Sequence, residues 1–270
     1  MVKNQIVILL LGTLLLSSCI LADRSGCPTY LTLSLAKAPE DVDSLYLITR
    51  SIDGSEGKRV VHRGEFSSGY TLYISKKVSH IAVYGNVKSM IYDNGFITPY
   101  GQCCDPIYTS FISAGYNDDV AYEEVVLRKN HIRIHIKITG IILSSDTITA
   151  TLSGTSIGYN TLGEVIGGEF CHSPELIFSK GNGKETSDII CSSIVPRQMD
   201  SNLYLIIHQI SEGGKKELLK VSLSDALKNS GIDMESPDLE DLYMTIDSSF
   251  SSIIISVEDF DSDEQIYITI

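Results

Sequence analysis

The residue with the clearest chemistry is Cys19, because it follows a stretch with the pattern of a lipoprotein export signal. A short polar start with one cation, Lys3, precedes an apolar run from Ile6 to Leu16, and Leu16-Ser17-Ser18-Cys19 ends that run with small residues. In the lipoprotein pathway, diacylglycerol is attached to such a sulfur before cleavage frees the amine for a further acyl chain. The apolar run is shorter than the roughly twenty residues of a transmembrane helix. We therefore predict a signal peptide over residues 1–18 and lipidation at Cys19.

Composition restricts the class of the mature protein and its partners. The 270 residues carry 34 Asp and Glu against 21 Lys and Arg, a formal net charge of −13. Phosphate backbones and anionic headgroups repel such a chain, so we expect no nucleic-acid binding and no electrostatic membrane binding. Ordinary secretory cleavage after Ala22 is the alternative to lipidation, but Ile20 is poorly suited to the small position that this cleavage requires. The length suits two domains of ordinary size.

Five cysteines besides Cys19 could form disulfides in an exported protein. Cys171 and Cys191 are the first pair to test, because both lie in the same predicted domain. Cys103 and Cys104 have no His or Cys at metal-ligand spacing, so we expect a loop with a disulfide partner and not a metal site. Neither a metal nor a cofactor is expected anywhere in the chain.

One motif is typical of a hydrolase. Gly154-Thr155-Ser156-Ile157-Gly158 matches G-x-S-x-G and follows a predicted strand. In a hydrolase the chain then enters a helix, whereas Tyr159 to Gly163 have turn and strand character, and His172 and His208 lack a triad context. We expect Ser156 to lie in a hairpin loop and the protein to have no enzymatic activity, while a hydrolase using Ser156 stays open as an alternative.

Two further patterns have the residue types of metal sites. Asp259, Asp261 and Asp263 alternate as in a calcium loop, but the central Gly and the terminal Glu are missing, so we predict a solvated acidic turn. His131 and His135 lie on the same side of a predicted strand as neighbouring cations, and we expect that side to face solvent without binding zinc.

Alternation of apolar and polar residues predicts strands over most of the chain. Ile132, Ile134, Ile136 and Ile138 interleave with basic residues, which indicates a strand with one buried face. Turn-forming clusters such as Asp53-Gly54, Asp93-Asn94-Gly95 and Gly181-Asn182-Gly183 separate the strands. Further strands are predicted at Tyr30–Leu35, Ser44–Thr49, Tyr70–Ser75, His80–Tyr84, Val120–Leu127, Thr147–Ser153, Leu203–Gln209, Ile253–Val257 and Ile266–Ile270.

Helical signal is sparse. Asp225 to Asn229 forms the clearest candidate, with Ser224 placed as N-cap and Gly231 as the stop, and Pro237 to Leu242 could form another turn. Many short strands with helices confined to connections predict an all-β sandwich architecture. Because strand-rich sequence lies on both sides of Leu127-Arg128, we predict domains at 19–127 and 128–270.

The start of the mature chain carries a more specific pattern, in which Cys19 is followed by Asp23-Arg24-Ser25-Gly26-Cys27-Pro28 and then by Leu31-Thr32-Leu33. This start resembles the fimbrillin-associated anchor lipoproteins, which tether the fimbriae of Bacteroidales to the outer membrane. Val42–Ile48, His80–Asn86 and Arg128–Gly140 resemble later strands of that family. The resemblance implies two tandem transthyretin-like Greek-key β-sandwiches, no enzymatic activity, and a surface lipoprotein that anchors a fimbrial shaft and limits its length. The sequence departs from the family by its lack of Trp and by Cys103-Cys104.

The resemblance also suggests how this chain pairs with a fimbrial shaft subunit. Related stalk subunits polymerise when an N-terminal strand is removed and a neighbour's strand fills the groove. Acylation at Cys19 would retain the strand near Tyr30–Leu35, so we expect no open groove and an end to growth at the base. The strand with Ile266, Ile268 and Ile270 is either donated to the shaft or kept in its own domain.

The location and the alternative function follow from the same features. Lipidation predicts an outer-membrane protein, and Asp23 close to Cys19 is a weak indication of the outer leaflet and the cell surface. A surface glycan-binding lipoprotein is the alternative to a fimbrial anchor. Such a protein would present aromatic platforms, and the chain has 14 Tyr but no Trp.

Overall fold

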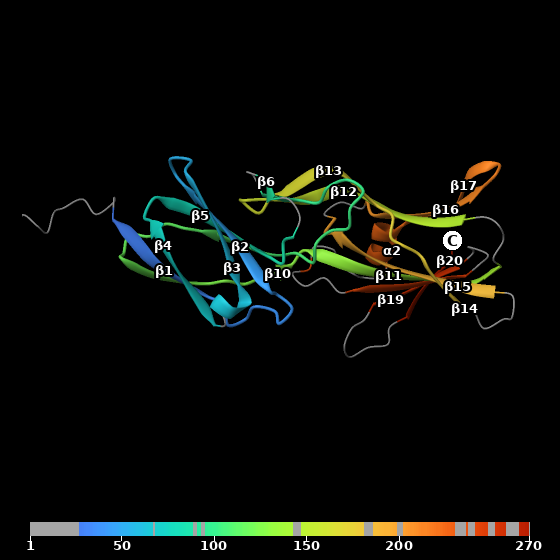
Figure 1. The fold of residues 1–270 in the computed structure, drawn as a ribbon, viewed down its shortest axis with the longest axis horizontal. Helices are drawn as coiled ribbons and strands as arrows, with labels where there is room; N and C mark the ends of the chain where they lie inside the picture. The colour runs from blue at the N-terminus through green and yellow to red at the C-terminus, as the bar shows by residue number, and fades with distance from the viewer. Residues whose placement is uncertain are drawn as a thin grey trace, which may run out of the picture.

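Four β-sheets form two sandwiches that follow one another along the long axis of the molecule (Figure 1). The computed structural model describes residues 27–66, 68–88, 91–92, 95–142, 147–180, 186–198, 202–229, 236, 241–247, 252–257 and 265–269. Nearly all regular structure in these residues is β-strand, which confirms the predicted all-β sandwich fold. None of the helices in the described part of the chain is long and apolar enough to cross a bilayer.

The N-terminal sandwich consists of a three-stranded and a five-stranded sheet. The three-stranded sheet has the order β4-β1-β9, with β4 at Gly69–Ser75, β1 at Pro28–Ser34 and β9 at Val120–Glu124. The five-stranded sheet has the order β10-β8-β5-β2-β3, with bounds Arg128–Lys129, Tyr108–Ser113, Val78–Gly85, Ser44–Ser51 and Glu56–His62. A 3-10 turn, η2 (Arg63–Glu65), follows β3.

The C-terminal sandwich consists of two longer sheets and one short helix. The first sheet has the order β14-β15-β11-β18-β19-β20, at Ile177–Lys180, Thr186–Pro196, His131–Ile142, Leu242–Asp247, Ser252–Val257 and Gln265–Thr269. The second has the order β17-β16-β12-β7-β6, at Gly214–Ser222, Tyr204–Ser211, Thr147–Asn160, Gly95–Ile97 and Ile91–Tyr92, and β13 (Val165–His172) also pairs with β12. Helix α2 spans Leu223–Asn229.

Strand β11 shows why the alternating sequence folds in this way. Ile132, Ile134, Ile136 and Ile138 are at most 2% exposed and form part of the C-terminal core, as predicted. Full burial of one such side chain is worth about 1.5–3 kcal/mol relative to leaving it in water. The four side chains therefore fix which face of β11 turns inward, because a slip of one residue would expose all of them.

The helix in the C-terminal sandwich has a different cap from the predicted one. The Ser222 hydroxyl accepts a hydrogen bond from the Asp225 amide at 3.2 Å, while the Ser224 hydroxyl accepts one from the Leu203 amide at 2.9 Å. Ser224 therefore joins the helix to the start of the neighbouring strand. Leu242, predicted to end a second helical turn, begins β18 instead, and residues 237–240 lie outside the described residues.

The two sandwiches exchange strands at their junction. Strand β7 precedes the predicted domain boundary, yet it pairs with β12 of the C-terminal sandwich, and β10, which follows that boundary, pairs with β8 of the N-terminal sandwich. Between them lies an apolar cluster, the junction cluster, formed by Ile48, Ala82, Tyr84, Phe96, Cys104, Ile107 and Tyr159. The Tyr84 hydroxyl donates to the Asn160 carbonyl at 2.9 Å across this junction.

The G-x-S-x-G motif is part of this junction and not a hairpin loop. Ser156 lies within the continuous strand β12 and is 3% exposed. A Cβ atom on Gly154 would lie 2.4 Å from the Gln198 Oε1 atom, and one on Gly158 would lie 1.9 Å from the Phe96 carbonyl oxygen. The Gln198 Oε1 atom accepts hydrogen bonds from the Thr155 and Ser156 amides, both at 2.8 Å. The two glycines are therefore required for close packing.

Replacing Gly158 tests the strand exchange. A Gly158→Ala variant should force β7 away from β12 and lower the free energy of unfolding by about 2 kcal/mol or more, the typical cost of overpacking. Gly167→Ala is the matched control, because the added Cβ has no neighbour within 4 Å. Denaturant unfolding of both variants is the measurement, and equal stability of the two would contradict a packing role for Gly158.

Candidate functional site

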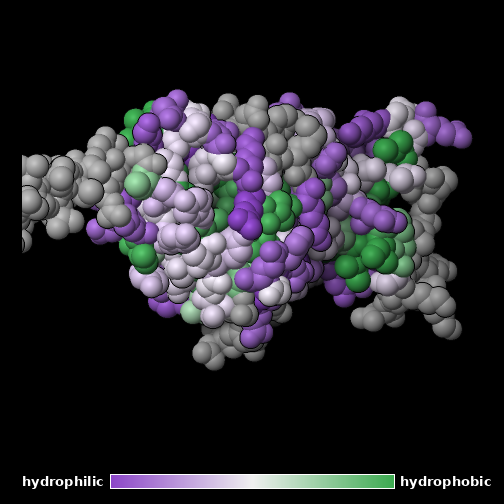
Figure 2. Space-filling view, turned by 60° about the vertical axis from the view of Figure 1, so that its left-hand side comes forward, coloured by the Kyte–Doolittle hydropathy of each residue, from purple (hydrophilic) through white to green (hydrophobic). Residues whose placement is uncertain are grey.

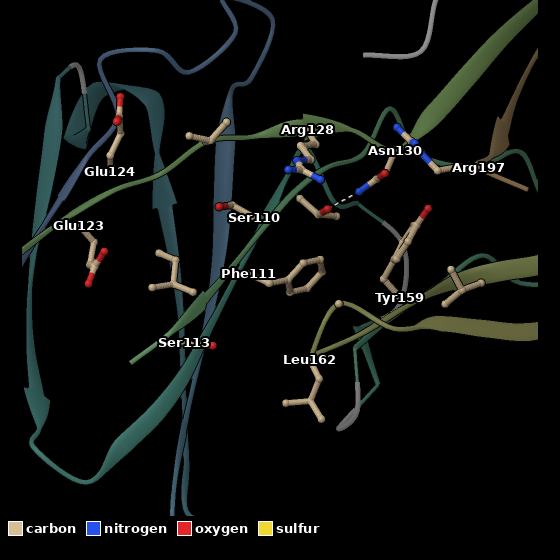
Figure 3. Close-up of a pocket in the computed structure, with 15 residues that line it drawn as sticks. Ser110, Phe111, Ser113, Glu123, Glu124, Arg128, Asn130, Tyr159, Leu162 and Arg197 are labelled. Atoms are coloured by element: carbon tan, nitrogen blue, oxygen red, sulfur yellow. Dashed lines mark hydrogen bonds between the residues drawn. The ribbon is translucent and has the colours of Figure 1, made fainter. Parts of the chain in front are cut away.

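A groove in the N-terminal sandwich beside the junction has the geometry of a binding site, with a volume of about 720 Å³ (Figure 3). It lies where the chain leaves β9 in one sheet and enters β10 in the other. Arg128 pairs with Thr109 of β8 and closes the groove at one end. Toward Ser113 and Glu123 the two chain segments diverge, so the groove is open at its other end.

One wall of the groove is an incompletely paired strand edge. The Ala114 amide donates to the Ser79 carbonyl, so in this antiparallel pair the backbone groups of alternate residues, including Phe111 and Ser113, point away from β5. Strand β10 pairs only with Tyr108 and Thr109. Among the described residues, the outward N–H and C=O groups of Phe111 and Ser113 therefore have no partner strand.

Apolar side chains line the groove next to this edge. Phe111 lies in the middle of Figure 3, with Leu162 below it, and Val126 and Leu162 are 53% and 45% exposed. Leu162 is presented by the turn between β12 and β13. At Gly163 of that turn, which has a φ of +86°, a Cβ would lie 2.7 Å from the Phe111 ring, so glycine is needed both for the backbone and for the contact.

The turn is held in place by its own hydrogen bonds. The Asn160 Oδ1 atom accepts from the Leu162 and Glu164 amides, both at 2.9 Å. The C-terminal sandwich therefore supplies a rigid part of the wall of a groove that belongs mainly to the N-terminal sandwich.

Polar groups occupy the closed end of the groove. The Asn130 side chain donates to the Thr109 hydroxyl, and the Arg197 guanidinium donates to the Lys129 carbonyl at 2.9 Å. The Tyr159 side chain is 5% exposed, and its hydroxyl has no hydrogen-bond partner among the residues that the structure describes. Burial raises the pKa of Tyr159, so this hydroxyl stays a neutral donor. A buried donor without a partner is costly, but the hydroxyl oxygen has almost no accessible surface, so it is not a contact for an incoming group.

This arrangement is suited to binding an extended polypeptide. An open strand edge offers main-chain hydrogen bonds, and the adjacent apolar pockets can take alternate side chains. The sequence led us to expect no open groove. Strand β1 is indeed held between β4 and β9, but the open edge belongs to β8, on a different part of the sandwich.

The predicted disulfide between Cys171 and Cys191 is wrong, since both are free thiols. On β13, Phe170 faces the core, so its neighbour Cys171 points to the opposite face of the sheet, near Tyr100. Cys191 is buried among the core side chains of the facing sheet, and burial raises its pKa to about 11. The two thiols point in different directions from different sheets.

Cys103 and Cys104 lie in a loop, as predicted, but neither has a disulfide partner. The Cys103 Sγ atom accepts a hydrogen bond from the Ile194 amide at 3.2 Å, and Cys104 belongs to the junction cluster. Burial raises the pKa of the Cys104 thiol, which keeps it protonated. No group of three or more metal-ligating side chains is found within the described ranges.

Three sets of predicted residues fall partly or wholly outside the described residues. Cys19 lies outside them, so its lipidation stays a prediction. Asp259, Asp261 and Asp263 also lie outside the described residues. Ile266 and Ile268 lie on β20, which pairs with β19 of its own sandwich, at Ile255 and Ile253. Ile270 is outside the described residues. In this structure the C-terminal strand is therefore paired within its own domain, where it forms an edge strand.

His131 is buried at the junction and not exposed to solvent as expected. Its side chain is 3% exposed, with Nδ1 at 3.0 Å from the Ile107 carbonyl oxygen and the ring edge-on to Tyr108. Burial, together with a smaller contribution from the nearby Lys129 ammonium, lowers the pKa of His131 to about 4. The other histidine of the predicted pair, His135, stacks on the Tyr243 ring with 4.5 Å between centroids.

Solved structures of several bacterial surface proteins have a fold similar to that of this chain. A candidate adhesin from Bacteroides thetaiotaomicron has a TM-score of 0.60 and 15% identity, over 92% of this chain and 100% of that one. The fimbrial anchor protein Mfa2 from Porphyromonas gingivalis has a TM-score of 0.57 and 12% identity, over 90% of this chain and 96% of Mfa2. The resemblance to fimbrial anchors is thus confirmed in the fold.

A third solved structure broadens the set of similar proteins. It is a candidate polysaccharide-binding protein from Bacteroides thetaiotaomicron, with a TM-score of 0.60 and 9% identity over 90% of this chain and 98% of that one. No protein-family model and no curated protein sequence matches the chain. At these identities the structural similarity shows a common fold and leaves ligands and partners open.

Burial of His131 predicts a dependence of stability on pH. The pKa falls from 6.5 to about 4 on folding, so stability is complete above pH 6.5 and declines as the pH falls toward 4. The total loss is about 3 kcal/mol, at roughly 1.4 kcal/mol per pKa unit. A His131→Asn variant has no titrating group here and should lose less stability over this range. Chemical unfolding of both proteins from pH 7 to pH 4 measures the difference, and parallel curves would contradict it.

Proposed function

We propose that this protein is an outer-membrane lipoprotein, without enzymatic activity, that anchors a fimbrium to the cell surface and limits its growth in support of adhesion. The observation that carries the proposal is the match of the two-sandwich fold over 96% of the fimbrial anchor Mfa2, in a chain whose first residues end in a lipobox at Cys19. A membrane-held amino end and an exposed strand-binding groove are the two elements that an anchor needs.

The groove beside β8 is the proposed contact with the shaft. A strand from a fimbrial shaft subunit would pair with the outward backbone groups of Phe111 and Ser113 and place apolar side chains against Phe111, Val126 and Leu162. This recognition depends mainly on the backbone, so it fits a partner whose strand alternates apolar and polar residues.

The same geometry explains how growth would end at this subunit. A shaft subunit must both accept a strand and donate one, whereas here the C-terminal strand β20 stays paired with β19. Strand β1 is the central strand of its sheet and carries the tether toward Cys19, so it cannot be removed without releasing the protein from the membrane. A subunit that accepts a strand but donates none would end the chain of shaft subunits at the base of the fimbrium.

A second candidate function, binding of a surface glycan, is favoured by one observation. Tyr30, Tyr73 and Tyr122 are 55%, 63% and 77% exposed on the three-stranded sheet, and the facing hydroxyls of Thr32 and Thr71 are 3.2 Å apart between them. Exposed tyrosines beside hydroxyl groups offer both stacking and hydrogen bonding to a sugar.

Loss of the acylated thiol separates the two candidates. In the native host, a Cys19→Ala variant of an anchor should shed most of its fimbriae into the medium, because a protein without acyl chains has lost its hold on the bilayer. Electron microscopy of cells and of the culture medium measures the distribution. Unchanged fimbriae together with impaired glycan uptake would contradict the anchor and support the glycan binder.

Removing one outward N–H group tests the groove itself. A Ser113→Pro variant cannot donate to an incoming strand, and its ring obstructs the edge, while the bonds between β8 and β5 stay intact. Since one net hydrogen bond is worth about 1 kcal/mol and the obstruction adds to that loss, we expect about a tenfold fall in attached fimbriae.

The matched control is Val60→Pro. Val60 lies on β3, at the opposite edge of the same sheet, where pairing with β2 leaves its backbone N–H pointing outward. Both variants should have the same thermal stability, and only Ser113→Pro should lose fimbriae. An equal loss from both variants would argue against the groove as the attachment point.

A further inference from the structure

Exposed aromatic and apolar side chains gather at the end of the N-terminal sandwich where β1 begins. Tyr30 lies directly opposite Tyr73 of β4 and beside Val120 of β9, so the three form one row on the outer face of the three-stranded sheet. The two tyrosine rings are 5.1 Å apart between centroids, and Val120 is 53% exposed. In Figure 2 much of the visible surface of this sandwich has intermediate hydropathy, the range of tyrosine and threonine.

A neighbouring turn brings Ile52 to the same end. Ile52 is 82% exposed, and its amide donates to the Lys77 carbonyl in the turn between β4 and β5 at 2.9 Å. The adjacent Lys76 ammonium lies 2.9 Å from a carboxylate oxygen of Asp119, whose carbonyl accepts from the Tyr30 amide at 2.8 Å. Ile52, Tyr30, Tyr73 and Val120 therefore belong to one continuous surface, the end surface.

The charges around the end surface nearly cancel and leave a small negative excess. Lys76 is paired with Asp119, and the Asp53 carboxylate accepts hydrogen bonds from the Ser55 hydroxyl and amide. Two further charged residues at this end, Lys77 and Asp118, have opposite signs. Such a surface has no attraction for anionic lipid, but tyrosine rings with a polar hydroxyl and exposed aliphatic side chains suit the boundary between headgroups and acyl chains.

The length of the tether argues for the membrane as the occupant of this surface. Eight residues separate Cys19 from Pro28, the first residue of β1. An extended chain spans at most about 3.6 Å per residue, so the end surface cannot move more than roughly 30 Å from an acylated Cys19. This confinement gives the end surface a high effective concentration at the bilayer. A contact that would be too weak to bring a free protein to the membrane can therefore form.

We propose that the end surface rests in the headgroup region of the bilayer that holds the acyl chains of Cys19. The inference depends on the lipid anchor of the proposed function and adds a defined orientation to it. With this end on the membrane, the long axis points outward, and β14 and β20 lie at the end remote from it (Figure 1). The groove beside β8 is then held away from the lipid surface, where a shaft subunit can reach it.

The lack of tryptophan in the chain allows a direct test. Tyr73→Trp and Ile52→Trp variants of the acylated full chain are reconstituted in phosphatidylcholine vesicles, with and without bromine on the upper part of the acyl chains. We expect the emission of both variants to shift to shorter wavelength and to be quenched by the brominated lipid. Phe178→Trp is the control, because Phe178 is 51% exposed on β14 at the remote end and should stay unquenched by lipid and open to iodide.

Each outcome decides one of the two claims. Protein that fails to float with the vesicles would overturn the lipid anchor itself. Floating protein with unquenched Tyr73→Trp and Ile52→Trp, or with equal quenching of Phe178→Trp, would overturn the end surface while leaving the anchor intact. Protection of Tyr73→Trp from iodide by a soluble glycan, without quenching by brominated lipid, would assign the surface to carbohydrate instead.

Discussion

The arrangement of the molecule depends on the backbone contact between β7 and β12, where a strand of the first half of the chain completes a sheet of the second half. This contact requires glycine at Gly158, because a side chain there would collide with the Phe96 carbonyl. Around it, Tyr84 and Cys104 are buried in the junction cluster, which removes apolar surface of both sandwiches from water at once. Unfolding one sandwich would expose this cluster, so the two halves stabilise each other and the groove at their junction keeps its shape.

The faces of the strands could be predicted from the sequence, but their partners could not. The alternation over Ile132–Ile138 identified the buried face of β11 correctly. Successive side chains of a strand point to opposite faces, so this pattern can be read from the local sequence. Strands β3, β7, β8, β13, β14, β15, β17 and β18 were not predicted. In several of them, such as β3 and β13, charged or glycine residues interrupt the alternation of apolar and polar residues. Strand β12 continues through Ser156 because Gln198 satisfies the backbone at a bulge, and no nearby residue indicates that contact.

The candidate site shows the same limit. An open edge is a property of the order of strands in a sheet, so nothing in the residues around Phe111 and Ser113 distinguishes them from a fully paired strand. His131 carried the pattern of an exposed position, and only the arrival of Ile107 and Tyr108 from the other sandwich buried it. Cys171 and Cys191 shared a predicted domain, but the face of the sheet to which each thiol points decides whether they can meet. By contrast, the predicted lipobox at Cys19 is a wholly local pattern, so it could be proposed from the sequence alone.

Strand β1 has a position that matters for any protein held by its amino end. It is paired along its length with β4 on one side, from Pro28 to Ser34, and with β9 on the other, from Tyr30 to Ser34. A force applied through Pro28 acts along the axis of this strand, and the hydrogen bonds to β4 and β9 both resist it. The backbone hydrogen bonds then resist together in shear, instead of opening one after another as they would if the strand were peeled from an edge. For a protein tethered by its amino end, tension along the tether would therefore act in the direction in which the sheet resists most strongly.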